Sequence, residues 1–402
     1  MNPKLQQLQP YPFEKLRQLF AGITPNPQLK PINLSIGEPK HPTPQFIRDA
    51  LVANLDGLAA YPVTIGRESL RHTIADWLKR RYGIAHIDPA TQIIPTLGSR
   101  EALFAFAQTV LDGSKTDGLI LCANPFYQIY EGAALLAGLK PYFINALPEN
   151  NFRQDWRSVP DDVWQRVQLV FTCSPGNPTG TVMTLDEWRE LFALSDKYGF
   201  IIAADECYTE IYFDEANPPL GALEAAEKLG RSDFPRLVVL GSLSKRSNVP
   251  GMRSGFAAGD ASIIKQFTLY RTYHGSAMSG SVQAASEAAW QDEAHVRENR
   301  RLYQEKFDVF YDIVNPVLPL TKPAASFYYW TQTPIDDKEF AVALLREKNV
   351  TVLPGSLLAR DAHGINPGKN FVRIALVSST EESKEGAQRI HDFIERLKTS
   401  GR

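Results

Sequence analysis

Between about residue 118 and residue 260, apolar strand-like segments alternate with helical segments, and this alternation restricts the fold more than any other feature. The strand-like segments are GLILCA, KPYFINA, VQLVFTC, FIIAADE and RLVVLGSLSK. The helical segments between them include QIYEGAALLAG and LDEWRELFALSDKYG. Such alternation is typical of a doubly wound, largely parallel sheet covered by helices on both faces. We therefore expect an α/β protein whose ligands bind beyond the carboxyl ends of the strands.

The segments outside this region predict a second, smaller unit. Residues 1–42 are rich in proline and polar residues and carry one compact element, INLSIGEP, a short strand that runs into a turn. Long helical patterns cover residues 262–311, and short strands followed by a helix make up the last ninety residues or so. We expect residues 1–45 to form an N-terminal arm and part of the small domain, residues 46–290 the large ligand-binding domain, and residues 291–402 a small α+β domain.

Composition and charge exclude several classes of protein. The 43 basic and 45 acidic residues are mixed along the chain, so neither nucleic acid nor an anionic membrane is an expected partner. No stretch approaches the length of a membrane span, and the N-terminus lacks an apolar signal segment, so we expect a cytoplasmic protein. The histidines never fall at ligand spacing, so no metal site is expected. The three cysteines, Cys122, Cys173 and Cys207, lie in or beside apolar segments and predict unpaired thiols.

Three strands end in polar residues that a core would not select. Asn177 lies in the tight loop CSPGNPTG, Asp205 in AADECY ends a run of apolar residues, and Lys245 follows the strand that leads into SLSKRSNVPGMR. A carboxylate near the top of a sheet is costly unless a cation faces it. A half-buried lysine near Arg246 and Arg253 has a lowered pKa, which makes its amine a nucleophile toward a carbonyl.

A pyridoxal 5'-phosphate group meets these requirements together. Its aldehyde would bind Lys245, its protonated ring nitrogen would face Asp205, and its ring oxygen would face Asn177 and Tyr208. Its phosphate would take hydroxyls, an arginine and the helix N-terminus that GSREAL predicts.

The motifs SPGNPTG, ADECY, SLSKxxxxPGMRSG and FVRIAL, in this order, closely resemble those of the class I aminotransferases of the fold type I pyridoxal-phosphate enzymes. The resemblance covers roughly residues 30–397. It implies an aspartate aminotransferase-like fold, the cofactor pyridoxal 5'-phosphate, amino-acid and keto-acid substrates, and a homodimer with shared active sites.

The resemblance also implies roles for individual residues. Lys245 is the lysine that binds the cofactor covalently and then moves the proton, with Asp205 and Tyr208 as its catalytic partners. The implied cofactor contacts are made by Ser99, Arg100, Tyr127, Asn177, Asp205, Tyr208, Ser242, Ser244, Lys245, Arg253 and, from the neighbouring subunit, Tyr61. The implied substrate contacts are made by Gly37, Asn177 and Arg373, whose guanidinium suits an α-carboxylate.

Some assignments have alternatives. Phe126 or Tyr130 could replace Tyr127 as the ring stacked on the cofactor, Asp205 could be a helix cap, and Arg373 could form a structural salt bridge. A pyridoxal lyase would use much of the same set of residues. A transcription regulator would need a DNA-binding module, and the roughly thirty residues before INLSIGEP are too few and too proline-rich to supply one.

The segments SIGEPKHPTP, SLSKRSNVPGMRSGF and TYHGSAMSGSVQAA most resemble those of the succinyldiaminopimelate aminotransferases of bacterial lysine biosynthesis. This resemblance implies L-glutamate as amino donor and N-succinyl-2-amino-6-oxoheptanedioate as acceptor, with a general aspartate or aromatic aminotransferase as the alternative. A substrate with distal carboxylates needs further cationic contacts, and Lys40, Arg246 and Arg271 are the candidates, although Arg246 could instead contact only a surface carboxylate.

Overall fold

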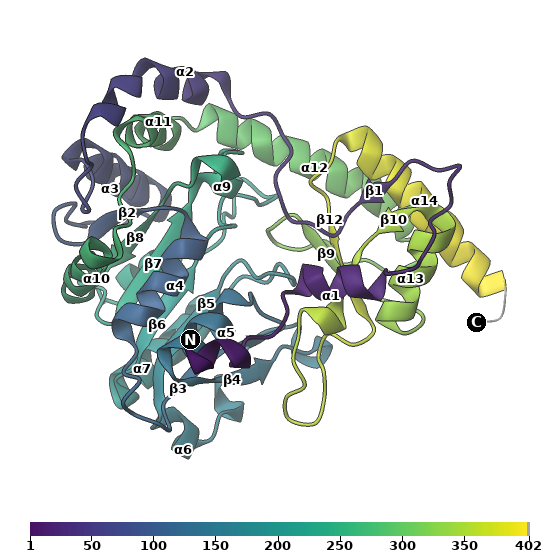
Figure 1. Cartoon of the computed structure of the whole chain (residues 1–402), viewed down its shortest axis with the longest axis horizontal. Coiled ribbons are helices and arrows are strands. Elements are labelled where there is room, and N and C mark those ends of the chain that lie inside the picture. The colour runs from purple at the N-terminus through teal and green to yellow at the C-terminus, as the bar shows by residue number, and fades with distance from the viewer. Residues whose placement is uncertain (400–402) are drawn as a thin grey trace.

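A computed structural model of the protein describes residues 1–399. A seven-stranded sheet forms the centre of the larger part (Figure 1). Its strands, in spatial order, are β2 (Ile93–Thr96), β8 (Gly255–Gly259), β7 (Leu237–Ser242), β6 (Ile201–Asp205), β5 (Val167–Cys173), β3 (Leu119–Asn124) and β4 (Lys140–Asn145). Only β8 runs antiparallel to its neighbours. The expected α/β fold with a mostly parallel sheet is thus confirmed.

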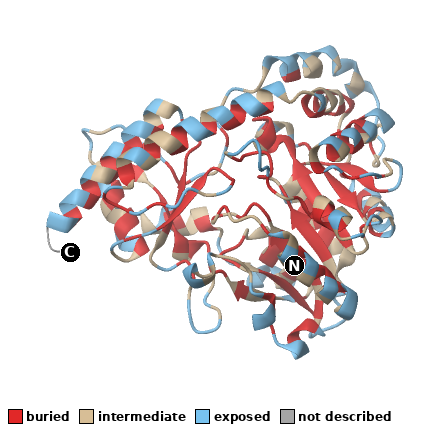
Figure 2. Ribbon diagram, turned by 180° about the vertical axis from the view of Figure 1, so that it is seen from behind, coloured by how far each residue is buried: buried red, intermediate tan, exposed pale blue. Residues whose placement is uncertain are grey.

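Helices cover both faces of this sheet because its strands are apolar on both sides, and Figure 2 shows the strands buried almost throughout. The helices of this part are α2 (Gln45–Ala53), α3 (Glu68–Tyr82), α4 (Ser99–Val110), α5 (Ile129–Ala137), α6 (Asp161–Trp164), α7 (Leu185–Tyr198), α8 (Ala222–Lys228), α9 (Leu243–Arg246), α10 (Ala261–His274) and α11 (Gly280–Gln291). One core on each face fills the space between helices and sheet.

Two small sheets form the second part of the molecule. β11 (Leu353–Pro354), β12 (Phe371–Ala375) and β9 (Tyr328–Gln332) make an antiparallel sheet, and β1 (Ile32–Asn33) pairs with β10 (Val350–Thr351). α13 (Asp337–Lys348) and α14 (Thr380–Thr399) pack beside them, and the long α12 (Ala294–Val314) runs from α11 to this part (Figure 1). The domain boundaries near residues 45 and 290 stay a prediction.

Several elements were not anticipated, among them α1 (Pro12–Leu19) and β8. Residues 1–42 contain the helix α1 besides the expected strand, because Pro12 occupies the first helical position, where its missing N–H costs nothing. β8 escaped prediction because Gly255–Gly259 lacks β-branched residues, and only its place between β2 and β7 makes it a strand. No helix within residues 1–399 is both long and apolar enough to cross a bilayer.

The three polar strand ends meet at one edge of the sheet. Cys173 pairs with Asp205 in register, and Asp205 pairs with Leu240, so the loops that follow β5, β6 and β7 leave the sheet side by side. The residues after these strands therefore face one region, as expected for a sheet of this topology.

Candidate active site

A cavity of about 540 Å³ lies at this edge, between the large sheet and the smaller part of the molecule. Residues from the N-terminal segment, the large sheet and β12 line it together. Among the lining residues are nearly all those that the sequence indicated: Gly37, Ser99, Arg100, Tyr127, Asn177, Asp205, Tyr208, Ser242, Ser244, Lys245, Arg253 and Arg373.

Lys245 projects from α9, a single helical turn that directly follows β7. Ser242 starts this turn, since its hydroxyl accepts a hydrogen bond from the Ser244 backbone N–H at 3.1 Å. The Lys245 ammonium donates to the Gly37 carbonyl at 2.8 Å. Burial lowers the pKa of Lys245, because desolvation penalises the charged amine. The amine is therefore more available as a base and a nucleophile than an exposed lysine.

Asp205 is a buried carboxylate at the end of β6, 2% exposed. One oxygen accepts from the Tyr130 hydroxyl at 2.8 Å and the other from the Cys207 backbone N–H at 3.3 Å. Burial raises its pKa, and no basic side chain within residues 1–399 forms a salt bridge with it. A buried carboxylate without a salt bridge fits a positively charged group bound in the cavity, such as the protonated nitrogen of a pyridine ring.

An anion-binding corner lies at the start of α4. Gly98 precedes the helix with φ +86°, and a Cβ atom there would lie 2.5 Å from the Arg253 guanidinium. Glycine therefore allows Arg253 to lie against the helix N-terminus, whose backbone N–H groups favour anions. The Ser242 and Ser244 hydroxyls, 2.9 Å apart, also line the cavity. These groups have the chemistry that binds a phosphate.

Arg373 lies on β12 and enters the cavity from the small sheet. Its two terminal nitrogens donate to the Asn177 side-chain oxygen at 2.9 Å and to the Ser35 carbonyl at 2.8 Å. Its Nε is buried without a partner among the described residues. The guanidinium thus carries an unsatisfied donor that a carboxylate could use.

Aromatic side chains complete the walls. Tyr127 lines the cavity, and its hydroxyl accepts from Arg100 Nε at 2.6 Å. The alternatives Phe126 and Tyr130 are buried outside its lining, although Tyr130 contacts Asp205. Tyr127 is therefore the residue of the three placed to contact a ring in the cavity.

One tyrosine of the site was missed at the level of sequence. Tyr328 lines the cavity, and its hydroxyl lies 2.9 Å from that of Tyr208. A Cβ atom on Gly37 would meet the Tyr328 hydroxyl at 1.8 Å, so any larger residue there would displace the Tyr328 side chain. Tyr328 gave no signal because it belongs to an ordinary apolar strand, whereas Tyr130, named only as an alternative ring on the cofactor, donates to Asp205 instead.

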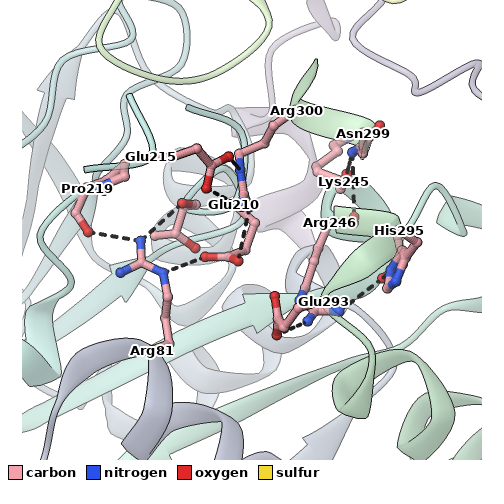
Figure 3. A network of polar contacts seen from close by, with 12 residues as sticks. Arg81, Glu210, Glu215, Pro219, Lys245, Arg246, Glu293, His295, Asn299 and Arg300 are labelled. Atoms are coloured by element: carbon pink, nitrogen blue, oxygen red, sulfur yellow. Dashed lines mark hydrogen bonds and ion pairs between the residues drawn. The ribbon is translucent and has the colours of Figure 1, made fainter. Parts of the chain in front are cut away.

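The cationic residues proposed for distal carboxylates were wrong in two cases. Arg246 is 1% exposed and forms an ion pair with Glu293 at 2.6 Å (Figure 3). It also donates to the Ala289 carbonyl. Arg271 is fully buried and bonds to Glu101. Both guanidiniums hold neighbouring helix ends together and cannot reach the cavity, whose lining also lacks the exposed Lys40.

Tyr61 lies apart from the cavity of its own chain. It is fully exposed, at 101%, and does not line the site. Its expected contact with a neighbouring subunit's phosphate stays a prediction.

Comparison with known proteins agrees with this arrangement of donors. The family profile "Aminotransferase class I and II" matches residues 30–390. An LL-diaminopimelate aminotransferase of Maridesulfovibrio salexigens is 31% identical over 393 residues, which covers 96% of this chain and 97% of that protein.

Solved structures give the same result. An aminotransferase from Neisseria meningitidis Z2491 is 53% identical, with a TM-score of 0.95 over 98% of this chain and 100% of that chain. A structure described as a probable N-succinyldiaminopimelate aminotransferase from Thermus thermophilus is 28% identical, with a TM-score of 0.80 over 91% of this chain and 95% of that chain. The chain therefore belongs to the class I and II aminotransferases and is an enzyme that depends on pyridoxal 5'-phosphate.

Proposed function

We propose that the enzyme transfers the amino group of L-glutamate to N-succinyl-2-amino-6-oxoheptanedioate. The products are 2-oxoglutarate and N-succinyl-LL-2,6-diaminoheptanedioate. The observation that carries this proposal is the cavity of about 540 Å³, which combines an arginine donor at one wall with room for the cofactor together with a substrate. The name of the Thermus thermophilus structure and the diaminopimelate names of the relatives support it.

In this proposal each residue has a defined task. Bound pyridoxal 5'-phosphate supplies an electron sink when the amino acid loses its α-proton. Lys245 Nζ, whose pKa is lowered by burial, takes and returns this proton. The Asp205 carboxylate stabilises a positive ring nitrogen, and Arg373 binds the α-carboxylate that donor and acceptor share.

The test compares acceptors. We expect kcat/KM for the succinylated keto acid to exceed that for oxaloacetate at least a hundredfold, on the order of 3 kcal/mol. Comparable efficiencies would refute the proposal and favour a general aspartate or aromatic aminotransferase. Release of a keto acid and ammonia without any acceptor would instead indicate a lyase.

A second candidate is transamination of unsuccinylated LL-diaminopimelate. The names of the curated relatives favour it, and so does Glu38, whose side chain lines the cavity and could pair with a distal ammonium. Succinylation removes that ammonium. Glu38→Gln should therefore lower kcat/KM for LL-diaminopimelate as donor to 2-oxoglutarate and leave the succinylated substrate unaffected, if this candidate is correct.

We also propose a homodimer in which Tyr61 reaches the phosphate of the partner subunit. Exposed apolar side chains gather within residues 55–63, namely Leu55, Leu58, Tyr61 and Val63. Such a group is unusual on a monomer. Sedimentation of the holoenzyme should give twice the mass of the chain, and Leu58→Asp should reduce it; a monomeric wild type would contradict the proposal.

A further inference from the structure

Residues 35–41 connect the two functional cations of the cavity. The Ser35 carbonyl accepts from Arg373 at 2.8 Å, and the Gly37 carbonyl accepts from the Lys245 ammonium at 2.8 Å. The same segment follows β1, so it enters the site from the two-stranded sheet of β1 and β10. The side chain of Lys245 is thus held by this segment at its outer end.

His41, at the end of this segment, reaches the backbone of the same lysine through Asn299 on α12. His41 Nδ1 lies 2.7 Å from Asn299 Oδ1, and Asn299 Nδ2 donates to the Lys245 carbonyl at 3.2 Å (Figure 3). Asn248 also donates to Asn299 Oδ1, at 3.0 Å. Asn299 is 3% exposed, so water does not compete for these bonds.

Lys306 determines which atoms donate and which accept in the hydrogen bonds that link His41 to Asn299 and Lys245. It is 1% exposed and its ammonium contacts His41 Nε2 at 2.6 Å and the carbonyls of Leu376 and Val377 at 3.5 and 3.4 Å. An ammonium can only donate, so Nε2 must accept and Nδ1 must carry the ring proton toward Asn299.

The charges agree with this direction. Burial, together with Lys306, lowers the pKa of His41 to about 4, and burial lowers the pKa of Lys306 to about 8. At neutral pH the imidazole is therefore neutral beside a lysine that is largely protonated. The Lys306 ammonium then faces His41 Nε2, the His41 Nδ1–H faces Asn299 Oδ1, and Asn299 Nδ2 faces the Lys245 carbonyl.

We propose that His41 and Asn299 are positioning residues that fix the backbone of Lys245, with Lys306 holding His41 in the tautomer that this requires. α9 is a single turn, so its final carbonyls lack helical partners, and Asn299 supplies the donor to them. Residues 37–41 thereby hold Lys245 at both ends, at the ammonium through Gly37 and at the carbonyl through His41 and Asn299. The proposal rests on the proposed role of Lys245 as the proton-transferring residue.

A matched pair of variants tests it. His41→Asn keeps an N–H near the position of Nδ1, whereas His41→Gln offers its amide near Nε2 and loses the bond to Asn299. Both remove the ring that packs on Tyr303 at 4.6 Å, so the loss of packing is shared. Each holoenzyme is assayed per bound cofactor in the half-reaction with L-glutamate and with α-deuterated glutamate.

We expect His41→Asn to stay within about threefold of the wild-type rate and His41→Gln to fall about tenfold, with a larger deuterium isotope effect, because a displaced Lys245 slows proton transfer. The second readout needs no turnover: the pH midpoint of the visible absorption band of the lysine-bound cofactor should move by roughly half a unit in His41→Gln only. Equal isotope effects and equal pH midpoints in the two variants would overturn the proposal.

Asn299→Asp decides the matter if His41→Gln does not fold. Its carboxylate still accepts from His41 but cannot donate to the Lys245 carbonyl, so it should behave as His41→Gln; a wild-type isotope effect and pH midpoint would overturn the proposal. Lys245→Ala distinguishes a failure of the positioning role of His41 and Asn299 from a failure of the proposed role of Lys245. If that variant still formed the lysine-bound band, the role of Lys245 itself would be wrong, whatever the His41 pair shows.

Discussion

Replacing Arg373 by lysine should weaken both halves of the reaction by the same factor. The variant keeps the positive charge but loses the planar fork. A single ammonium cannot replace the bonds to Asn177 at 2.9 Å and Ser35 at 2.8 Å and also supply the donor that Nε now holds without a partner. One lost hydrogen bond to a charged group costs about 2–3 kcal/mol, which is roughly 30- to 150-fold in kcat/KM.

The assay measures kcat/KM for L-glutamate and for the keto-acid acceptor separately, by stopped-flow absorbance of the two half-reactions. Both substrates carry the α-carboxylate, so both values should fall together. Arg389→Lys is the matched control, since Arg389 is a buried arginine of α14 that binds the Lys30 and Lys348 carbonyls outside the cavity. Unchanged values, or a decrease for one substrate alone, would refute the assignment of Arg373 to the α-carboxylate.

Buried polar groups supply three further predictions. Arg246→Met should lower the free energy of unfolding by about 2–4 kcal/mol, because the Ala289 carbonyl and Glu293 lose their donor. The ratio of kcat/KM between the succinylated acceptor and oxaloacetate should stay unchanged. A changed ratio would show that Arg246 contacts the substrate. Tyr130→Phe should lower the free energy of unfolding by about 1–3 kcal/mol, measured in urea, because Asp205 loses a buried donor; equal stability would contradict the contact. Folding lowers the pKa of Lys306 from 10.5 to about 8, so between these pH values the unfolded chain binds a proton that the folded chain does not. The free energy of unfolding of the wild type should therefore rise with pH by up to about 1.4 kcal/mol per pH unit relative to that of Lys306→Met. A constant difference between the two proteins from pH 8 to pH 10 would show that the lysine is not desolvated.

The sheet and the cavity were predictable because their signals are local. The apolar strands and the polar residues that end them lie within a few positions of each other, so Asn177, Asp205 and Lys245 could be brought to one edge of the sheet from topology alone. Arg373 needed the family resemblance, because nothing in FVRIAL shows that β12 faces the large sheet.

What the sequence could not give depends on contacts between distant segments. Arg246 was expected near substrate because it follows Lys245, yet successive residues of a helical turn point in different directions, and its side chain is buried against Trp290. Tyr328 reaches the cavity, and Asn299 reaches Lys245, only through the packing of β9 and α12. No spacing in the sequence carries that information.

The central claim is that Lys245 binds pyridoxal 5'-phosphate and moves the proton in a glutamate-dependent transamination. The most direct test is an absorbance scan of the purified holoenzyme and of Lys245→Ala. The wild type should show a visible band that glutamate bleaches and that the succinylated keto acid restores, and the variant should show neither change. A Lys245→Ala protein that turns over at the wild-type rate would contradict the claim.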